Sequence, residues 1–433
     1  MSGIKGEVLW PRLVASKIFK KRLGGNNFVA DYPTGDDSFM DIPPCFAPSA
    51  TLLKDSDKET PNYKYRIDII DQVFVSTWNV GGVEPTENTA VDDLIDHTNP
   101  CDIYVFGFQE VVPLRAGNVL GSEKSKISIK WNSLIRAALM KIDTKHKTNE
   151  QYSSFKCIIS KQMVGILISV WVRAELRPYI RNPSVSCVGC GIMGCLGNKG
   201  SVSVRFRLHE TSFCFVCSHL ASGGREAHHK YRNSNIQEIL SRTIFSSGSS
   251  LHLPTDILHH DRVIFLGDLN YRISLPESTT RLLVYEGDWN ALLEHDQLRM
   301  ELMEGQVLEG WHEGSINFGP TYKYYPGSDE YYGIFEGEKK RAPAWCDRII
   351  WQGEGVKQHL YERVESKLSD HRPVRAIFST QVRVKLKLRA LGNFFLSERF
   401  ERFTNSDTNL HNFQDDFPNS CSNPRFSLHL ADF

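Results

Sequence analysis

The sequence lacks both a long hydrophobic run and an excess of charge of either sign. No stretch reaches the roughly 18 consecutive apolar residues of a membrane-spanning helix. Lys and Arg total 51, as do Asp and Glu, whereas a protein that wraps a nucleic-acid duplex normally carries a basic excess. The remaining composition, 41% hydrophobic and 24% charged over 433 residues, predicts one large globular domain with appendages and no nucleic-acid partner.

Signals for secretion and lipid attachment are missing as well. The segment from Met1 to Lys5 has no apolar signal-peptide region, and Ser2 stands where N-myristoylation needs glycine. The stretch from Leu430 to Phe433 has no cysteine for prenylation. These absences predict a cytoplasmic location.

Disulfides and a zinc site are not expected, although the chain has ten cysteines. Cys214 and Cys217 lie in a strand-like run, where their odd spacing points the two side chains to opposite faces. A closed zinc site needs thiolates that converge. We therefore predict free, buried thiols in a reducing compartment.

Several phosphate-handling motifs are absent or stand in the wrong context. Cys217 lies too far before Arg225 for the loop of a cysteine phosphatase, and no Walker loop occurs. The glycines of residues 189–194 match a dinucleotide-binding fingerprint, but residues 201–208 alternate like a strand where that fingerprint requires a helix. The same glycine-rich segment, which continues to Lys199, still suits close approach of the backbone to an anion.

The pattern along the chain divides it into an N-terminal extension (1–66), a main domain (67–380) and a C-terminal tail (381–433). Within the extension, residues 8–23 predict a short basic amphipathic helix, and the composition of 24–64 predicts a loop or linker. Residues 382–389 alternate apolar and basic side chains, which is typical of a half-buried strand.

Short apolar runs in the main domain predict buried strands, and amphipathic patterns predict helices between them. We expect strands at 72–80, 102–110, 155–160, 163–173, 201–208, 213–219 and 263–266, and helices at 90–97, 131–141, 225–245 and 289–303. Strands that are linked by hairpins and mixed with helices favour a two-sheet α/β sandwich over a purely parallel sheet.

Polar side chains stand where the apolar strands end. The run from Val263 to Leu266, for example, stops at Gly267-Asp268-Leu269-Asn270. Such an end is either a simple Asx turn or a functional loop. The pattern recurs along the chain at strand ends or in flanking loops, at Asn79, Glu110, His219, Asp268, Asn270, Asp347, Asp370 and His371.

These residue types together predict metal-assisted attack of water on a phosphoester. Carboxylate and amide oxygens suit Mg²⁺, which takes only one or two carboxylates from a protein. Histidines with an acidic partner suit protonation at a phosphate, and Lys and Arg on loops suit additional phosphates.

Eight segments of the main domain carry a family signature: Thr77-Trp-Asn-Val80, Phe106-Gly-Phe-Gln-Glu110, Gly197-Asn-Lys-Gly200, Ser218-His-Leu220, Gly267-Asp-Leu-Asn-Tyr-Arg272, Pro320-Thr-Tyr-Lys-Tyr324, Arg341-Ala-Pro-Ala-Trp-Cys-Asp-Arg-Ile349 and Ser369-Asp-His-Arg-Pro373. This set resembles the inositol-polyphosphate 5-phosphatases, especially the plant type, within the deoxyribonuclease-like Mg²⁺-dependent phosphoesterase superfamily. The resemblance covers roughly residues 70–380, and segment 341–349 is highly specific for 5-phosphatases. It implies that the main domain is an inositol-polyphosphate phosphatase catalytic domain.

The resemblance also implies catalytic roles. Asp268 would be the general base that takes a proton from the attacking water, and Asn270 would help to orient that water. His371, aligned by Asp347, would grip the scissile phosphate together with His219.

Metal and substrate contacts follow from the same resemblance. Glu110 would hold Mg²⁺, with Asn79 close to the metal and phosphate and Asp370 on the metal side. The neighbouring 4-phosphate would be bound by Tyr322, Lys323, Lys339 and Arg341. Additional positive charge in the pocket would come from Arg272 and Lys199. The expected substrates are inositol phosphates and phosphoinositide lipids.

Two other functions stay open from the residues: a nuclease of the same superfamily and a catalytically inactive phosphoinositide-binding scaffold. The balanced charge and segment 341–349 weigh against the nuclease, and the complete acidic set weighs against the scaffold. Trp78 and Trp345 are expected in the core, while Ile192 and Met193 either contact lipid or pack inward.

Lipid substrates would require visits to the inner leaflet of the plasma membrane. Segments 17–22 and 382–389 are basic, and every Lys or Arg in them would be attracted to an anionic membrane surface by about 1 kcal/mol. We therefore expect transient, salt-sensitive membrane binding.

Overall fold

The computed structural model describes residues 27–31, 65–120, 125–146, 155–191, 194–225, 227–246, 253–304, 307–338 and 340–386. Apart from Tyr65 and Leu386, all of these belong to one structural unit. The expected helix at 8–23, the basic residues 17–22, the Ile192-Met193 pair and Lys339 lie outside the described residues, so the expectations for them stay predictions.

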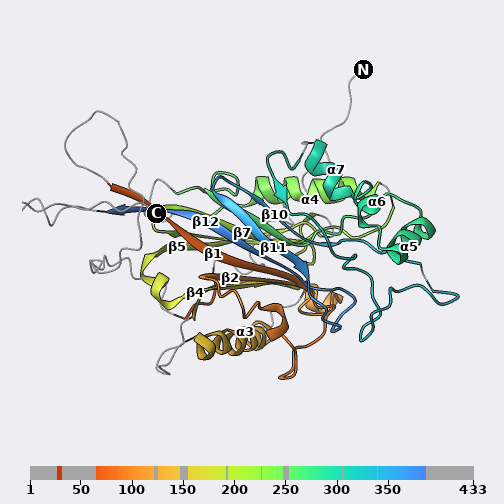
Figure 1. Cartoon of the computed structure of the whole chain (residues 1–433), viewed down its shortest axis with the longest axis horizontal. Helices are drawn as coiled ribbons and strands as arrows, with labels where there is room; N and C mark the ends of the chain where they lie inside the picture. The colour runs from red at the N-terminus through yellow and green to blue at the C-terminus, as the bar shows by residue number, and fades with distance from the viewer. Residues whose placement is uncertain are drawn as a thin grey trace, which may run out of the picture. The chain divides into compact units, whose positions relative to one another are not determined.

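The described part of the chain contains two six-stranded sheets (Figure 1). Sheet A has, in spatial order, β11 (Val356–Arg363), β12 (Val374–Leu386), β1 (Tyr65–Asn79), β2 (Ile103–Gln109), β4 (Ile166–Arg173) and β3 (Phe155–Met163). Sheet B has β5 (Ile180–Gly189), β6 (Gly200–Leu208), β7 (Thr211–His219), β8 (Arg262–Asp268), β10 (Asp347–Gln352) and β9 (His312–Glu313). With its helices, this arrangement confirms the predicted two-sheet α/β sandwich.

Each sheet contains one parallel pair of strands that brings polar strand ends together. β1 runs parallel to β2, and Asn79 is in register with Gln109. β7 runs parallel to β8, and His219 is in register with Asp268. The antiparallel strand β10 begins opposite the end of β8, so Asp347 also faces Asp268. Consequently, residues far apart in the sequence meet at the same edges of the two sheets.

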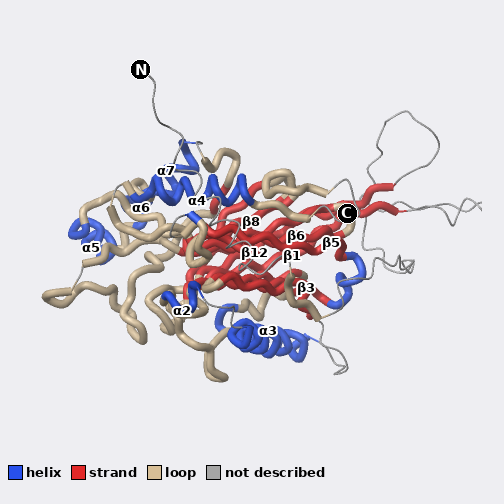
Figure 2. Tube along the Cα trace, turned by 180° about the vertical axis from the view of Figure 1, so that it is seen from behind, coloured by secondary structure: helices blue, strands red, loops and turns tan. Residues whose placement is uncertain are grey.

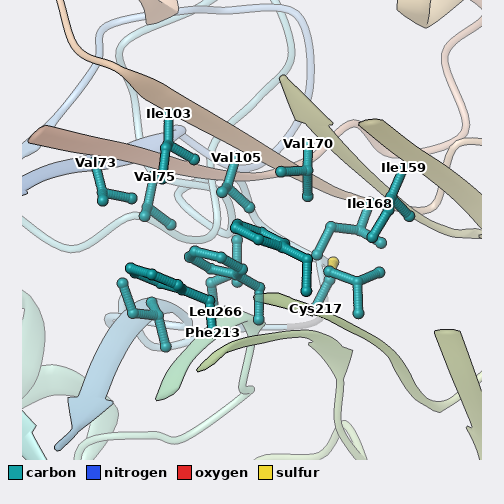
Figure 3. Packing of buried hydrophobic residues seen from close by; sticks show 14 of the residues in the cluster. Val73, Val75, Ile103, Val105, Ile159, Ile168, Val170, Phe213, Cys217 and Leu266 are labelled. Atoms are coloured by element: carbon teal, nitrogen blue, oxygen red, sulfur yellow. The ribbon is translucent and has the colours of Figure 1, made fainter. Parts of the chain in front are cut away.

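The core lies between the sheets and consists of apolar side chains from both. Figure 3 shows Val75, Val105 and Val170 of sheet A facing Phe213 and Leu266 of sheet B. Because helices cover the outer faces too, strands such as β2 and β8 are buried throughout their length, which accounts for their nearly continuous apolar sequence.

Helices cover the outer face of each sheet (Figure 2). Helix α3 (Ser125–His146) packs Trp131 against Trp78 of sheet A, and helices α4 (His228–Arg242) and α7 (Gln297–Glu304) pack Ile236 and Leu298 on sheet B. Trp345 is also fully buried, so both tryptophans expected in the core lie there. Smaller helices complete the described part: η1 (Asp92–Leu94), α2 (Ala116–Leu120), η2 (Ala174–Tyr179), α5 (Glu277–Glu286) and α6 (Trp289–Leu293).

The cysteines behave as expected from their spacing. In the described residues they are all free, and all but Cys187 are buried. Cys217 packs in the core between the sheets, whereas Cys214 packs on the other face of β7 under α4. Their opposite orientation prevents these two thiols from converging on one zinc ion.

Two local expectations were wrong. The helix predicted at 90–97 is only a short 3₁₀ turn, η1. The helix predicted over 289–303 is two helices, α6 and α7, separated by Glu294, His295 and Asp296. Within the loop or linker predicted over 24–64, the described residues 27–31 form one bridge with β3: Val29 N donates to Ser160 O at 2.9 Å, and Ser160 N donates to Val29 O at 2.8 Å.

The strands at the two ends of the domain extend beyond the expected boundaries, since β1 begins at Tyr65 and β12 continues to Leu386. Val382 is buried and Arg383 is half-buried, consistent with the half-buried strand expected there. None of the helices in the described ranges is long and apolar enough to cross a membrane.

A close approach of the two sheets at Gly107 in β2 yields a stability prediction. A Cβ atom at this position would lie 2.7 Å from Leu266 Cδ1 and 2.9 Å from Cys217 Sγ. We expect Gly107→Ala to lower the free energy of unfolding by about 1–3 kcal/mol, the usual cost of overpacking a core. Urea denaturation measures this. Gly117→Ala in α2, where nothing lies within 4 Å of the added Cβ, is the matched control and should not destabilise the protein. Equal stability of both variants would contradict the packing argument.

Candidate active site

Asp268, the last residue of β8, occupies the centre of the polar cluster and is only 2% exposed. Its Oδ2 accepts a hydrogen bond from Asn79 Nδ2 at 2.9 Å and lies 3.1 Å from His219 Nε2. Its Oδ1 accepts a bond from the backbone N–H of Asn270 at 3.1 Å. Because Asn79 belongs to sheet A and Asp268 to sheet B, this carboxylate joins the two sheets.

The carboxylate of Asp268 is held in its ionised form. Burial acts to raise its pKa, but the interactions with His219, His371 and Lys199 outweigh burial and keep the pKa of Asp268 well below its usual range. An ionised carboxylate at this position can accept a proton from a bound molecule.

Lys199 supplies the positive charge beside Asp268. Its Nζ contacts His219 Nε2, and burial lowers the pKa of Lys199 to about 8 although Asp268 and Glu110 oppose the shift. Burial and the neighbouring Lys199 also lower the pKa of His219. Near neutral pH, His219 is therefore uncharged and Lys199 carries the proton.

A second histidine lies on the other side of Asp268. His371 Nδ1 donates to Asp347 Oδ2 at 2.8 Å, and Thr321 Oγ1 donates to the same oxygen at 2.7 Å. Burial acts to lower the pKa of His371, but the carboxylates of Asp347 and Asp268 raise it to about 9. His371 is thus a buried cation at neutral pH, with Nε2 3.9 Å from Asp268 Oδ2.

Three further hydrogen bonds fix the loops that carry these residues. Ser369 Oγ donates to the carbonyl oxygen of Asn79 at 2.6 Å, which ties the loop before β12 to the end of β1. Asn270 adopts a left-handed backbone conformation with φ of 58°, which asparagine tolerates better than most residues. Its amide donates to Leu220 O at 3.2 Å and accepts from Arg272 Nη2 at 2.6 Å.

Oxygen ligands for a divalent cation are available beside this cluster. Glu110 follows β2 in a left-handed conformation with φ of 55°, and its side chain is 29% exposed and 3.9 Å from His219 Nε2. Asn79 Oδ1 already accepts a bond from Gly81 N at 3.0 Å, and Asp370 Oδ2 accepts one from Lys323 at 2.8 Å. The hard oxygen donors of this set fit Mg²⁺.

Another group of possible metal ligands overlaps the catalytic residues. One ligand atom each from Asp268, Asp347 and His371 lies within 4.8 Å of the others. However, the protonated His371 has no free lone pair for a metal ion, because Nδ1 bonds to Asp347 and Nε2 carries the second proton. The partly exposed carboxylate of Glu110 is the better placed ligand on these grounds.

Basic and aromatic side chains border the cluster on one side. The Arg272 guanidinium lies 4.4 Å from the ring centroid of Tyr322, and that ring lies 4.6 Å from the His371 ring. Lys323 Nζ lies 5.0 Å from the ring of Tyr332 while it pairs with Asp370. Such a cationic border is suited to a ligand with several phosphates.

The structure thus brings together most of the residues selected from the sequence: Asn79, Glu110, Lys199, His219, Asp268, Asn270, Arg272, Tyr322, Lys323, Asp347, Asp370 and His371. Three residues beside this cluster had no predicted role, namely Thr321, Ser369 and Tyr332, although the first two stand inside the family motifs. Only their tertiary contacts reveal what they hold in place.

Comparisons with known proteins agree with this geometry. Residues 76–377 match the model of the Endonuclease/Exonuclease/phosphatase family 2. Type IV inositol polyphosphate 5-phosphatase 9 of Arabidopsis thaliana is 61% identical over 91% of this chain and 96% of its own length. Type I inositol polyphosphate 5-phosphatase 8 of the same plant is 43% identical over 88% of each chain.

Solved structures show the same architecture. The crystal structure of the inositol polyphosphate 5-phosphatase domain of SPsynaptojanin, in complex with inositol (1,4)-bisphosphate and calcium ion, superposes with a TM-score of 0.64 at 30% identity. The superposition covers 78% of this chain and 92% of the synaptojanin domain. A Cimex nitrophorin, at 18% identity and a TM-score of 0.53, shares the fold alone.

The fold and the site define a member of the endonuclease/exonuclease/phosphatase class. Within that class, the sequence identity over nearly the whole chain is decisive. This chain belongs to the inositol polyphosphate 5-phosphatases and is an enzyme of that family.

The raised pKa of His371 generates a prediction about pH. A histidine with a pKa of about 9 stays protonated below that pH and loses its charge above it. If His371 acts as a cation, kcat/KM should fall as the pH rises through about 9. Asp347→Asn removes the closest anion, so the pKa of His371 should drop toward 6.5 and the alkaline limb should move to lower pH.

A pH–rate profile of each variant measures this shift. Lys199, with a pKa of about 8, also titrates in the alkaline range. An alkaline limb caused by Lys199 would stay at the same pH in the Asp347→Asn variant. Asp256→Asn removes the carboxylate from an exposed pair with His259 and is the matched control. An alkaline limb that stays in place in Asp347→Asn would exclude His371 as its origin.

Proposed function

We propose that the protein is a Mg²⁺-dependent phosphatase that removes the 5-phosphate from inositol polyphosphates, from phosphoinositide headgroups or from both. One observation carries this proposal: the buried, ionised Asp268 lies between His219 and Asn79 and faces the protonated His371. A proton acceptor such as Asp268 close to a cation such as His371 suits the hydrolysis of a phosphate monoester.

In this reaction Asp268 takes a proton from the attacking water, and Asn270 helps to orient that water. The low pKa of Asp268 keeps the carboxylate unprotonated at neutral pH. The bond from the backbone N–H of Asn270 fixes the orientation of the carboxylate. Preorganised groups of this kind need no rearrangement when charge develops.

His371 and His219 contact the scissile phosphate. The proton on His371 Nδ1 is bonded to Asp347, so Nε2 is left to donate toward a phosphate oxygen. His219 Nε2 lies near both Asp268 and Lys199, so the lysine charge would act on the same phosphate. Hydrogen bonds from charged donors to phosphate are stronger than neutral ones.

Glu110 is the proposed Mg²⁺ ligand, with Asn79 beside the metal and Asp370 on the metal side. When bound, Mg²⁺ would stabilise the negative charge of the phosphate group. Asp370 offers only Oδ1 while its Oδ2 pairs with Lys323.

A second phosphate of the substrate, the neighbouring 4-phosphate, would lie against the basic and aromatic border. The proposed contacts are Tyr322, Lys323, Lys339 and Arg341, with Arg272 and Lys199 adding positive charge. The support is the position of Lys323 between the rings of Tyr322 and Tyr332, at 5.7 and 5.0 Å. Such a held ammonium is oriented before a ligand arrives.

The first experiment tests the reaction itself. We expect the protein to release phosphate from inositol 1,4,5-trisphosphate with Mg²⁺ and to stop when EDTA removes the metal. Asp268→Ala should lower kcat by about 10²–10⁴-fold while substrate binding survives, because a general base contributes on that order. Plasmid nicking is measured beside it. Nicking without phosphate release would identify a nuclease, and binding without either activity would identify a scaffold.

The second experiment tests the 4-phosphate contacts. Lys323→Ala should raise KM for inositol 1,4,5-trisphosphate, because a charge-assisted bond worth about 1.5–3 kcal/mol is lost. A substrate with a 5-phosphate but no 4-phosphate should barely respond. Lys367→Ala, which breaks an exposed ion pair with Asp329, is the matched control. Equal losses on both substrates would show that Lys323 has another role.

A further inference from the structure

Arg281 of helix α5 joins two segments that are far apart in the sequence. Its Nη2 donates to the carbonyl oxygen of Tyr332 at 2.6 Å and to that of Arg341 at 3.0 Å. One turn earlier on the helix, the carboxylate of Glu277 pairs with Arg281 Nε and fixes the direction of the guanidinium. A rigid helix thereby holds both ends of the intervening chain.

The segments that contain Tyr332 and Arg341 pack closely against each other and against Arg281 at Gly333. This glycine has φ of 94°, in the left-handed region that favours glycine. A Cβ atom on it would lie 3.0 Å from Arg281 Nη2 and 3.3 Å from Lys340 Cα. The chain after Tyr332 therefore returns to within van der Waals distance of the chain before Arg341, with the guanidinium beside the junction.

Tyr332 connects this junction to Lys323. Its backbone N–H donates to the carbonyl oxygen of Lys323 at 2.8 Å, and its ring lies 5.0 Å from Lys323 Nζ. Arg281 thus bonds to the backbone of Tyr332. Tyr332 in turn contacts Lys323 twice, through a main-chain hydrogen bond and through its ring beside the ammonium group. The second carbonyl that Arg281 grips belongs to Arg341, another proposed phosphate contact.

We propose that Arg281 is a positioning residue that holds Lys323 and Arg341 in place and thereby sets selectivity for substrates with a phosphate next to the scissile one. This inference rests on the proposed function, because that function assigns the 4-phosphate to Lys323 and Arg341. Arg281 acts through the backbone of Tyr332 and Arg341. Holding flexible basic side chains before binding reduces the ordering that the ligand must impose.

A general structural role for Arg281 makes a different prediction. If the arginine only stabilised the fold, its loss would lower the unfolding temperature and would affect all substrates equally. A positioning role changes KM for one class of substrate and leaves kcat and the other class nearly unchanged. The two roles are therefore separable by kinetics.

The test compares full-length Arg281→Gln and Arg281→Lys with wild type on inositol 1,4,5-trisphosphate and on a substrate with a 5-phosphate but no 4-phosphate. Arg281→Gln should raise KM about tenfold for the first substrate and less than twofold for the second, since roughly one hydrogen bond to a charged group is lost in effect. Arg281→Lys keeps a cation at the site and should restore part of the affinity.

Arg375→Gln is the matched control, because Arg375 also pairs with a glutamate, Glu362, and donates to the carbonyls of Asp93 and Leu94. It should leave the ratio of the two KM values at the wild-type level. In the double variant Arg281→Gln/Lys323→Ala, the KM effect should be smaller than the product of the single effects, because Lys323 is one route through which Arg281 acts.

The outcomes separate the two proposals. Suppose that wild type hydrolyses both substrates and that Lys323→Ala raises KM only for the substrate with the 4-phosphate. If Arg281→Gln then leaves the ratio of the two KM values unchanged, the positioning role is refuted and the proposed function stands. Equal KM increases on both substrates, or a double variant showing the full product, would also refute it. If Lys323→Ala itself shows no selectivity, the proposed 4-phosphate contact fails first.

Discussion

The buried negative charge of Asp268 is the constraint around which the rest of the site is arranged. Moving a carboxylate out of water costs several kcal/mol unless hydrogen bonds and opposite charges compensate it. Here the compensation comes from both sheets and from the loops between them: Asn79 from β1, the Asn270 backbone after β8, Lys199 before β6 and His371 before β12. The elements at this end of the sandwich are thus linked to one another through a single side chain.

The residue pattern and the family resemblance together selected most residues of the cluster, and the strand pairing of the structure explains why they lie close together. Asn79, His219 and Asp268 each end an apolar run, and parallel pairing places such ends at a common edge. The odd spacing of Cys214 and Cys217 predicted their opposite faces for the same reason. Repeating patterns of this kind are local properties of the chain, so they can be read without knowledge of the tertiary structure.

Other features depend on contacts between distant segments and could not be predicted in that way. Thr321 bonds to Asp347 and Ser369 bonds to the backbone of Asn79, across separations of 26 and 290 residues. The helical pattern over 289–303 concealed a break at Asp296, whose carboxylate accepts two bonds from the buried Arg348 in the core. Asp296 also caps α7, because Arg299 N donates to its Oδ1 at 2.9 Å. The buried Arg348 explains why this carboxylate points into the core and not to solvent.

The short segment around Val29 has a consequence for the outer edge of sheet A. Without it, the free side of β3 would present unpaired N–H and C=O groups, and an exposed strand edge of this kind invites pairing with another polypeptide. Val29 occupies the position opposite Ser160, and Asp31 bonds to the Cys157 backbone and to Arg136 of α3. This segment therefore covers part of the edge of β3 and leaves fewer of its backbone groups open to pairing with another chain.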